Sequence, residues 1–389
     1  MKEMQLSKRV QNIAASQSLA MAARAKAMKE SGVDVISMSL GEPDMDTPEH
    51  IRRAAQEAVD NGWSHYGPVP GIPSLRTAIA AHQNKAIGNK IDWEATDVIV
   101  SIGAKMAIYN AIQTAINPGD EVIIPMPSWV SYTEMVKLAE GKVVPIQTTF
   151  ESNYCVTPEQ LRAALTSKTR MLILCTPNNP TGSVYSPDQL REIVAILREY
   201  PDVYIIADEI YACLTYGVEA VSFGAFPELA DRLIIINGVS KAYAMTGYRI
   251  GWLLTKNKAF VSGCVRLQGQ QLTCATMVAQ KAAEVALTGS QDCVEDMRKI
   301  FAERRELICQ MATKIPGWKF NKPQGAFYLF PDVSAIGTGD EVAEKILEQA
   351  HVAVVSGSAF GSPECIRLSY AISTQEVEEA MKRISAVKF

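Results

Sequence analysis

The sequence has few histidines and no long apolar run. Only four histidines occur in the 389 residues, and they lie far apart: His50, His65, His82 and His351. This scatter disfavours a histidine-rich metal site or a serine-histidine triad, and favours surface or core roles for each histidine. Because no stretch approaches eighteen apolar residues, we expect no membrane span. Charges recur every few positions near the N-terminus, which is not typical of a signal peptide.

Neither the cysteines nor the charges form a pattern that points to a special class of protein. The eight cysteines show no C-x-x-C spacing, and several lie inside apolar runs. We therefore expect reduced, buried thiols in a cytoplasmic protein rather than a disulfide framework. Lys plus Arg is 38 against 42 for Asp plus Glu, with neither sign in blocks, so we expect no nucleic-acid partner. With 48% hydrophobic and 21% charged residues, the composition excludes disorder.

Short β-branched runs alternate with helical patterns from about residue 98 to about residue 255. Continuous apolar strands separated by helices predict a mostly parallel sheet with helices on both faces. The fold class is therefore α/β in this part of the chain. In such a domain we expect the functional residues at the carboxyl ends of the strands.

The pattern changes after residue 256, and a second, smaller α+β domain is predicted. A long helical stretch covers residues 294–315, and strand-like segments follow at 318–322, 325–330, 352–356 and 365–371, before a helix at 373–389. We expect residues 1–47 to be an N-terminal segment and part of the small domain, 48–300 the large domain, and 301–389 the C-terminal small domain. Because no flexible Gly/Ser linker occurs, we expect a continuous helix to carry the boundary.

The sequence lacks the motifs that are typical of several common enzyme and nucleotide-binding classes. The sequence contains no G-x-x-x-x-G-K-[ST], no G-x-G-x-x-G and no G-x-S-x-G. One strand, at 98–102, does end in Gly103-Ala104-Lys105, where a helix begins at once. The free amides of that helix terminus would stabilise a phosphate. A glycine at any strand-to-helix turn gives the same pattern, so this motif alone decides nothing.

Three later strands also end in residues suited to binding or catalysis. The loop 176–182 holds two prolines and a glycine, which fits either a rigid binding loop or a plain turn. Asp208 ends the next strand, and a buried carboxylate there needs a cationic partner. Lys241 follows Ser240 at the end of the third. A desolvated lysine is nucleophilic and forms Schiff bases with carbonyls, although most strand-end lysines are solvated.

Taken together, the motifs resemble the class I pyridoxal-phosphate aminotransferases, from about residue 7 to the C-terminus. In order, they are G-E-P-D, the Tyr66 segment, G-A-K, P-S-W, N-N-P-T-G, D-E-I-Y, S-K-A-Y-A-M-T-G-Y-R-I-G and I-R-L-S-Y-A. The most specific residues are Asn179, Asp208, Tyr211, Lys241, Arg249 and Arg367. The segments 103–105, 129–132 and 244–247 look most like the bacterial aspartate aminotransferase subgroup. The resemblance implies the aspartate-aminotransferase-like fold, fold type I.

The resemblance also implies roles around a pyridoxal 5'-phosphate cofactor. Lys241 would carry the cofactor covalently and move the proton between the substrate Cα and the cofactor C4′. Asp208 would pair with the pyridine nitrogen and keep it protonated. Tyr211 and Asn179 would hydrogen-bond the ring oxygen, and Trp129 would stack on the ring. We also predict, from the resemblance, a cis peptide bond between Asn179 and Pro180.

Further residues match the family's phosphate site. Gly103, Ala104 and Lys105 would bind the cofactor phosphate, with Arg249 as counter-ion. Tyr66 would reach that phosphate from the neighbouring subunit, so the resemblance implies a homodimer. The chain departs from many relatives in having Gly238 where they carry a phosphate-binding serine.

The resemblance places the substrate as well. Arg367 would bind the substrate α-carboxylate in a bidentate pair, with the Gly41 backbone close to the same group. Lys105 and Ser16 would meet a distal carboxylate. Met106, beside Lys105, replaces a more usual glutamine.

The resulting hypothesis is a transaminase that exchanges an amino group between an L-amino acid, with aspartate as the favoured donor, and 2-oxoglutarate. Lys105 favours a dicarboxylate substrate. Aminotransferases for aromatic or sulfur amino acids, and a pyridoxal-phosphate-dependent β-lyase, remain alternatives because all need Lys241, Asp208 and Arg367. A non-catalytic effector-binding relative is a remote alternative, since fewer than fifty residues precede the predicted large domain and leave no room for a DNA-binding module.

Overall fold

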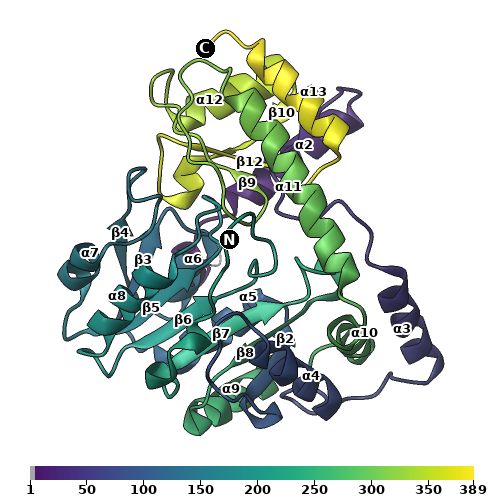
Figure 1. Cartoon of the computed structure of the whole chain (residues 1–389), viewed down its shortest axis with the longest axis vertical. Helices are drawn as coiled ribbons and strands as arrows, with labels where there is room; N and C mark the ends of the chain where they lie inside the picture. Colours follow the sequence, from purple (N-terminus) through teal and green to yellow (C-terminus); the bar gives the residue numbers. More distant parts are fainter. Residues whose placement is uncertain (1–4) are drawn as a thin grey trace.

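A seven-stranded sheet forms the centre of the larger part of the molecule, in a computed structural model that describes residues 5–389 (Figure 1). The strands are β2 (Val98–Ile102), β3 (Glu121–Met126), β4 (Lys142–Gln147), β5 (Thr169–Cys175), β6 (Tyr204–Asp208), β7 (Leu233–Gly238) and β8 (Ile250–Leu254). Their order is β2-β8-β7-β6-β5-β3-β4, and β8 alone runs in the direction opposite to the other six strands. The predicted mostly parallel sheet is confirmed.

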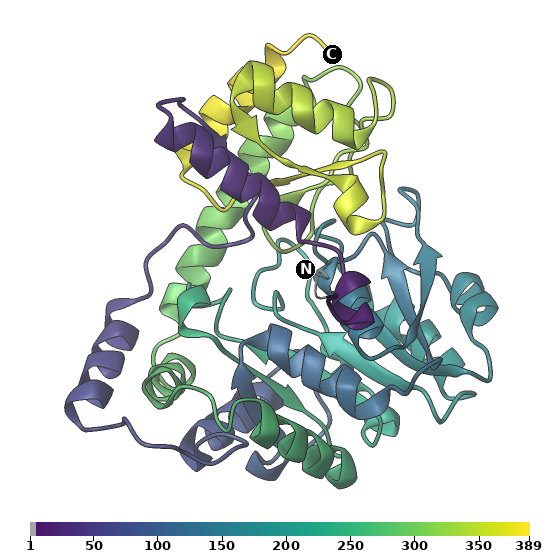
Figure 2. The same ribbon diagram turned by 180° about the vertical axis from the view of Figure 1, so that it is seen from behind.

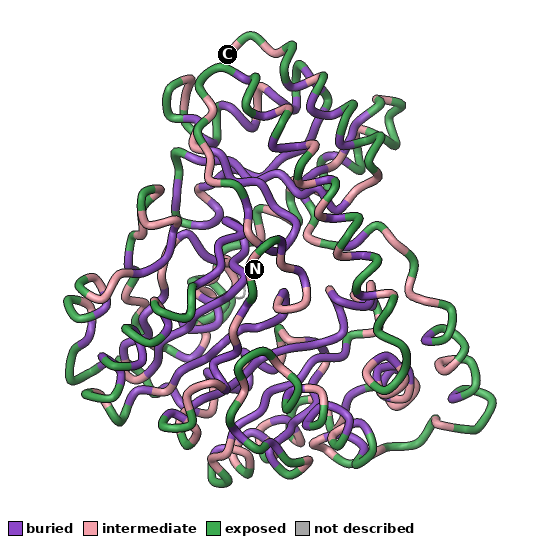
Figure 3. The backbone as a smooth tube through the Cα atoms, in the orientation of Figure 1, coloured by how far each residue is buried: buried purple, intermediate pink, exposed green. Residues whose placement is uncertain are grey.

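Helices cover both faces of this sheet, because its strands are apolar on both sides. Along β5, Leu172 and Leu174 belong to one buried core and Ile173 to another. Helix α5 (Ala104–Ala115) packs into the core that contains Ile173, and α8 (Pro187–Leu197) packs into the other. The other helices of this part are α3 (Glu49–Asp60), α4 (Pro73–Asn84), α6 (Ser131–Leu138), α7 (Pro158–Ala164), α9 (Lys258–Gln271) and α10 (Met277–Thr288). Figure 3 shows the resulting buried interior.

The second part of the molecule combines the two ends of the chain. Its three-stranded antiparallel sheet has the order β11-β12-β9, and a separate parallel pair joins β1 to β10. The strands are β1 (Ile36–Ser37), β9 (Tyr328–Leu329), β10 (Val352–Ala353), β11 (Val355–Ser356) and β12 (Ile366–Ser369), with helices α2 (Gln17–Glu30), α12 (Gly339–Lys345) and α13 (Thr374–Ser385). Figure 2 shows α2 lying against this part, and the short helix α1 (Lys8–Gln11) beside the large sheet.

One helix connects the two parts. Helix α11 (Asp292–Ala312) runs from the level of α10 up into the second part without interruption (Figure 1). The exact division of the chain at residues 47 and 300 stays a prediction. Within residues 5–389, no helix is long and apolar enough to cross a membrane.

Two of the predicted strand segments differ in the structure. Residues 318–322 are not a strand, because only Lys319 forms a ladder contact, a single bridge with Asp332. Asn321 instead donates its side-chain amide to the Phe150 carbonyl at 2.8 Å, and Pro323 has no N–H for a ladder. Residues 352–356 divide between two sheets, since β10 pairs with β1 and β11 pairs with β12.

Candidate active site

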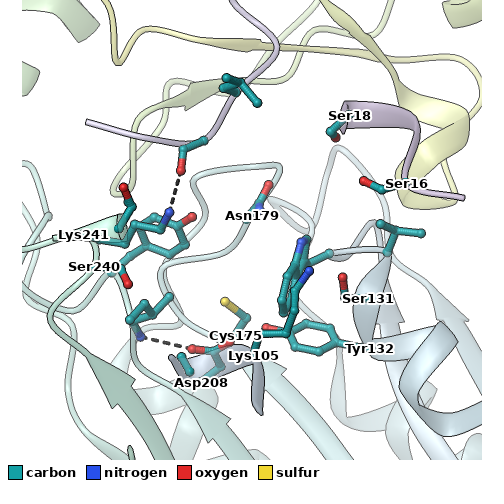
Figure 4. Close-up of a pocket in the computed structure, with 18 of the residues that line it drawn as sticks. Ser16, Ser18, Lys105, Ser131, Tyr132, Cys175, Asn179, Asp208, Ser240 and Lys241 are labelled. Carbon is teal, nitrogen blue, oxygen red and sulfur yellow. Dashed lines mark hydrogen bonds between the residues drawn. The ribbon is translucent and has the colours of Figure 1, made fainter. Parts of the chain in front are cut away.

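The carboxyl ends of β5, β6 and β7 open into a cavity of about 320 Å³, which also contacts the N-terminal segment and the second part. Parallel strands bring their carboxyl ends to one edge, which explains why residues distant in the sequence meet here. The cavity is lined by eleven of the predicted site residues: Ser16, Gly41, Ala104, Lys105, Trp129, Asn179, Asp208, Tyr211, Lys241, Arg249 and Arg367. Figure 4 shows Lys241, Asp208, Asn179 and Lys105 in this pocket.

Lys241 follows β7 and reaches into the cavity. Its Nζ donates a hydrogen bond to the Gly41 carbonyl at 2.5 Å (Figure 4). Burial lowers the pKa of Lys241 to about 8, although the Glu42 carboxylate works in the opposite direction. A lysine with this pKa has a larger neutral fraction near neutral pH than an ordinary lysine, and the neutral amine is the nucleophilic form.

Asp208 ends β6 and is buried at the floor of the cavity. Its carboxylate accepts hydrogen bonds from the Tyr132 hydroxyl at 2.6 Å and from the Ile210 amide at 3.2 Å. Burial raises the pKa of Asp208 to about 6. Among residues 5–389 it forms no ion pair with Lys or Arg, so the cationic partner expected from the sequence is not supplied by this part of the chain. The carboxylate is therefore available to a cation that binds in the cavity.

Arg367 on β12 is a buried cation in the cavity wall. One guanidinium nitrogen donates to Asn179 Oδ1 at 2.9 Å and another to the Ser39 carbonyl at 2.6 Å. Its Nε is buried without a hydrogen-bond partner within the described chain, and no carboxylate of residues 5–389 pairs with it. Burial lowers the pKa of Arg367. A buried guanidinium with unused donors is a binding group for an anion.

The loop that carries Asn179 has the predicted backbone. The Asn179–Pro180 peptide bond is cis, as are those at Met126–Pro127 and Thr176–Pro177. Within the loop, the Asn178 side chain donates to the Pro127 carbonyl and to the Thr181 hydroxyl, both at 3.0 Å.

The predicted phosphate site forms where β8 and the start of α5 meet. Gly103 has φ +86° and precedes the first helical residue, and a Cβ at this position would overlap the Arg249 guanidinium. A Cβ on Gly251 would overlap the Ala104 amide. Both glycines therefore allow the helix terminus and the Arg249 side chain to lie together. Free helix amides beside a guanidinium suit a phosphate.

Lys105 and Trp129 lie together in the same cavity. The Lys105 ammonium is 4.9 Å from the centre of the Trp129 ring, and burial, followed by the neighbouring Arg249 charge, lowers the pKa of Lys105. Ser16 and Ser18 face the cavity from the start of α2, where Ser16 also caps the helix by accepting from the Leu19 amide. Met106, which replaces the more usual glutamine, is not among the lining residues.

Tyr66 is the one predicted side chain that lies away from the cavity. It is 89% exposed and does not line the pocket of its own chain.

Gly238, which stands where many relatives carry a serine, faces Gly251 across β7 and β8. A Cβ on Gly238 would lie 3.0 Å from the Gly251 Cα. The nearby Ser240 is buried and lines the cavity.

Some lining residues were not found by the sequence reasoning. They are Tyr132, Cys175, Tyr328 and the carbonyl of Ser39. Tyr132 lies in the segment 129–132 that the resemblance singled out, although no role was assigned to it there. Tyr328 lies within a predicted apolar strand, and a backbone carbonyl has no sequence signal at all.

The chain matches the family model for aminotransferase class I and II over residues 33–384. It is 44% identical to an aspartate aminotransferase of Bacillus sp. (strain YM-2), with 99% of each chain covered. It is 41% identical to an aspartate/prephenate aminotransferase of Nitrosomonas europaea, covering 99% of this chain and 100% of that one. The crystal structure of the aspartate aminotransferase from Rhizobium meliloti superimposes with a TM-score of 0.95, at 38% identity and 99% coverage of both chains.

Fold, site and sequence thus agree on an enzyme that transfers amino groups. The chain belongs to the class I and II aminotransferases, and it depends on pyridoxal phosphate, as that family does. The residues present fit this cofactor: Asp208 is a buried carboxylate without a cation in the described chain, Lys241 is a lysine of lowered pKa, and Arg249 lies at a helix N-terminus.

Proposed function

We propose that the protein is an aspartate transaminase, which passes the amino group of aspartate to 2-oxoglutarate. The observation that carries the transaminase part of this proposal is the buried Arg367 guanidinium, which has an unpaired Nε and no carboxylate partner within the described chain. Leaving a buried charge uncompensated costs several kcal/mol, on the order of what a bound carboxylate would restore. Both aspartate and 2-oxoglutarate carry an α-carboxylate that would satisfy this group. The choice of aspartate rests on Lys105, which also lines the cavity.

The proposed residue roles follow from the geometry of the cavity. Arg367, Asn179 and the Gly41 backbone would bind the α-carboxylate, which would bring the substrate Cα towards Lys241. When bound, pyridoxal phosphate supplies an electron sink for the pair of electrons that remains after Cα loses its proton. Lys241 would hold and move that proton at Nζ, and its lowered pKa supports this role.

Other residues would hold the cofactor. Asp208, positioned by Tyr132 and the Ile210 amide, would pair with the ring nitrogen. Tyr211 and Asn179 would contact the ring oxygen, and Trp129 would cover one face of the ring. The phosphate would lie on Gly103, Ala104 and Lys105 with Arg249 beside it.

Preference for aspartate would come from Lys105 and Ser16. Two carboxylates require two binding groups, because burying the second one unpaired costs several kcal/mol. Lys105 is a further cation of the cavity, and it lies beside the Trp129 ring. A second candidate, transamination of an aromatic or another apolar amino acid, is favoured by Leu19 and Leu40, which line the cavity and are 62% and 41% exposed.

One steady-state experiment distinguishes aspartate transamination from transamination of an apolar amino acid. The purified enzyme would be given 2-oxoglutarate with aspartate, phenylalanine or methionine as amino donor, and glutamate formation measured. The proposal predicts a kcat/KM for aspartate at least about tenfold above the others, since a distal ion pair is worth 1.5 kcal/mol or more. A higher value for phenylalanine would select the second candidate. A β-lyase would be detected with S-methylcysteine, which carries a leaving group on Cβ: release of methanethiol, pyruvate and ammonia without glutamate would select that alternative.

We also propose that the enzyme is a cytoplasmic homodimer in which Tyr66 completes the site of the neighbouring subunit. Its 89% exposure and its position outside its own cavity support a role in another chain's site. Mixing Tyr66→Ala and Lys241→Ala subunits tests this. If Tyr66 acts in trans, each mixed dimer has one site with both defects and one intact site, so activity reappears on mixing. Activity that never exceeds the sum of the two parent variants would contradict it.

A further inference from the structure

A second tyrosine hydroxyl lies against Tyr211 in the cavity. Tyr328, on β9 of the small sheet, is 1% exposed, and its hydroxyl oxygen is 2.8 Å from that of Tyr211. The two rings meet edge to face, with centroids 5.9 Å apart and an interplanar angle of 81°. Tyr211 follows β6 of the large sheet, so this contact joins the two parts of the molecule at the pocket.

The position of the Tyr328 hydroxyl is fixed from two further sides. A Cβ on Gly41 would overlap it, so the absence of a side chain at Gly41 makes room for this hydroxyl. The Tyr328 ring lies 4.6 Å from the Arg367 guanidinium carbon, and the same guanidinium is 4.8 Å from the Phe360 ring. The hydroxyl therefore has little freedom to turn away from Tyr211.

The number of hydroxyl protons available sets the direction of the hydrogen bond between Tyr211 and Tyr328. A phenol has one proton to donate and can accept at its oxygen. If Tyr211 donates its only proton to the cofactor ring oxygen, the proton between the two phenols must come from Tyr328. We propose that Tyr328 is a positioning residue that donates to Tyr211 and so leaves the Tyr211 proton for the cofactor. This inference rests on the role of Tyr211 proposed above.

The surroundings of the pair favour this direction. The charged and titratable groups that face it are Arg367, Cys175 and, across the cavity, Lys241. The Arg367 cation makes the Tyr328 phenol a better donor, working against the burial that raises the pKa of Tyr328. Hydrogen bonds in a buried chain strengthen one another, so accepting a hydrogen bond from Tyr328 makes the Tyr211 hydroxyl a stronger donor in turn. A stronger donor at the ring oxygen weakens the attraction of that oxygen for a proton on the Lys241 nitrogen.

The pH titration of the cofactor's visible absorption in the holoenzyme tests the proposal. The midpoint reports how tightly the Lys241 nitrogen holds its proton. We expect Tyr211→Phe to raise the midpoint, and Tyr328→Phe to raise it by about half a pH unit, the effect of losing one modest hydrogen bond. In the Tyr211→Phe background, Tyr328→Phe should add nothing, because its effect passes through Tyr211. An unmoved midpoint in Tyr328→Phe, or additive shifts in the double variant, would overturn the proposal.

A further variant guards against a merely structural effect. Tyr370→Phe is the matched control, because its buried hydroxyl donates to the Ala326 carbonyl at 3.3 Å and does not line the cavity. Its midpoint should equal that of the unaltered enzyme, and an equal shift in Tyr370→Phe and Tyr328→Phe would also overturn the proposal. If Tyr211→Phe itself leaves the midpoint unchanged, the role proposed for Tyr211 fails instead.

Discussion

The Arg367 guanidinium and the Asn179 side-chain oxygen are joined by a hydrogen bond of 2.9 Å, although one residue lies on a small-sheet strand and the other in the loop after β5. Asn179 is thereby oriented with its oxygen towards the arginine, and its amide group is left to donate elsewhere in the cavity. The contact ties the group that would bind substrate to a group that would contact the cofactor.

The first prediction concerns Arg367→Lys. Lysine keeps the charge but cannot form a bidentate pair or reach both Asn179 and the Ser39 carbonyl. We expect kcat/KM for aspartate to fall by about 10²-fold, the equivalent of two lost charged hydrogen bonds. Steady-state kinetics with aspartate and 2-oxoglutarate would measure it. A change of less than threefold would remove Arg367 from the proposed carboxylate site.

The second prediction concerns Lys241. Borohydride reduction of the holoenzyme followed by peptide mass mapping should find the pyridoxyl group on Lys241. Lys241→Ala should lose turnover, because both the covalent link and the proton carrier are removed. The thermal unfolding midpoint of this variant should equal that of the parent protein. Modification of a different lysine would refute this assignment.

The third prediction uses the raised pKa of Asp208 in the protein without cofactor. The carboxyl has a pKa of 3.8 when unperturbed and about 6 in the folded chain. The folded state therefore holds a proton that the unfolded state has lost between these values, and stability falls as pH rises through this window. Asp208→Asn removes the free-energy cost of ionising this buried carboxyl, because asparagine carries no titrating group. We expect the apoprotein variant to be more stable than the parent above pH 6, by about 3 kcal/mol or less, and the gain to vanish below pH 4.

Denaturant unfolding of both apoproteins from pH 4 to pH 8 would measure this difference. With the cofactor bound, the order should reverse, because the ring nitrogen supplies the cation that Asp208 lacks. The same variant should also lose most of its transaminase activity while keeping some bound cofactor. A stability difference independent of pH would show that Asp208 is ionised without penalty, and near-normal kcat would contradict its role.

The fourth prediction concerns Lys105→Ala and substrate choice. If Lys105 binds a distal carboxylate, kcat/KM for aspartate should fall by about 10²-fold, equivalent to about 3 kcal/mol. Activity with phenylalanine or alanine, which lack that group, should change much less. Because Lys105 also lies near Arg249, equal losses on all donors would show that it serves the cofactor phosphate instead.

The large domain was predictable because its strands are buried on both faces and so appear as continuous apolar runs. Their carboxyl ends had to meet at one edge, which located Asp208 and Lys241 from the sequence pattern alone. The roles of Asn179 and Arg367 came only from the family resemblance. The predicted strand at 318–322 was wrong, because its apolar residues, Trp318 and Phe320, pack against the core without strand pairing. The Tyr211 and Tyr328 contact depends on how two sheets are placed, which no local pattern contains.

The proposed phosphate site combines residues from distant parts of the sequence. Gly103 directly follows β2 and Arg249 directly precedes β8, and these two strands pair at the edge of the sheet. Every other strand of the large sheet lies between them in the sequence. A growing chain that has not yet been synthesised past β8 therefore has no complete phosphate site. A phosphate held by both Gly103 and Arg249, as proposed, therefore requires that the two edge partners β2 and β8 have already paired.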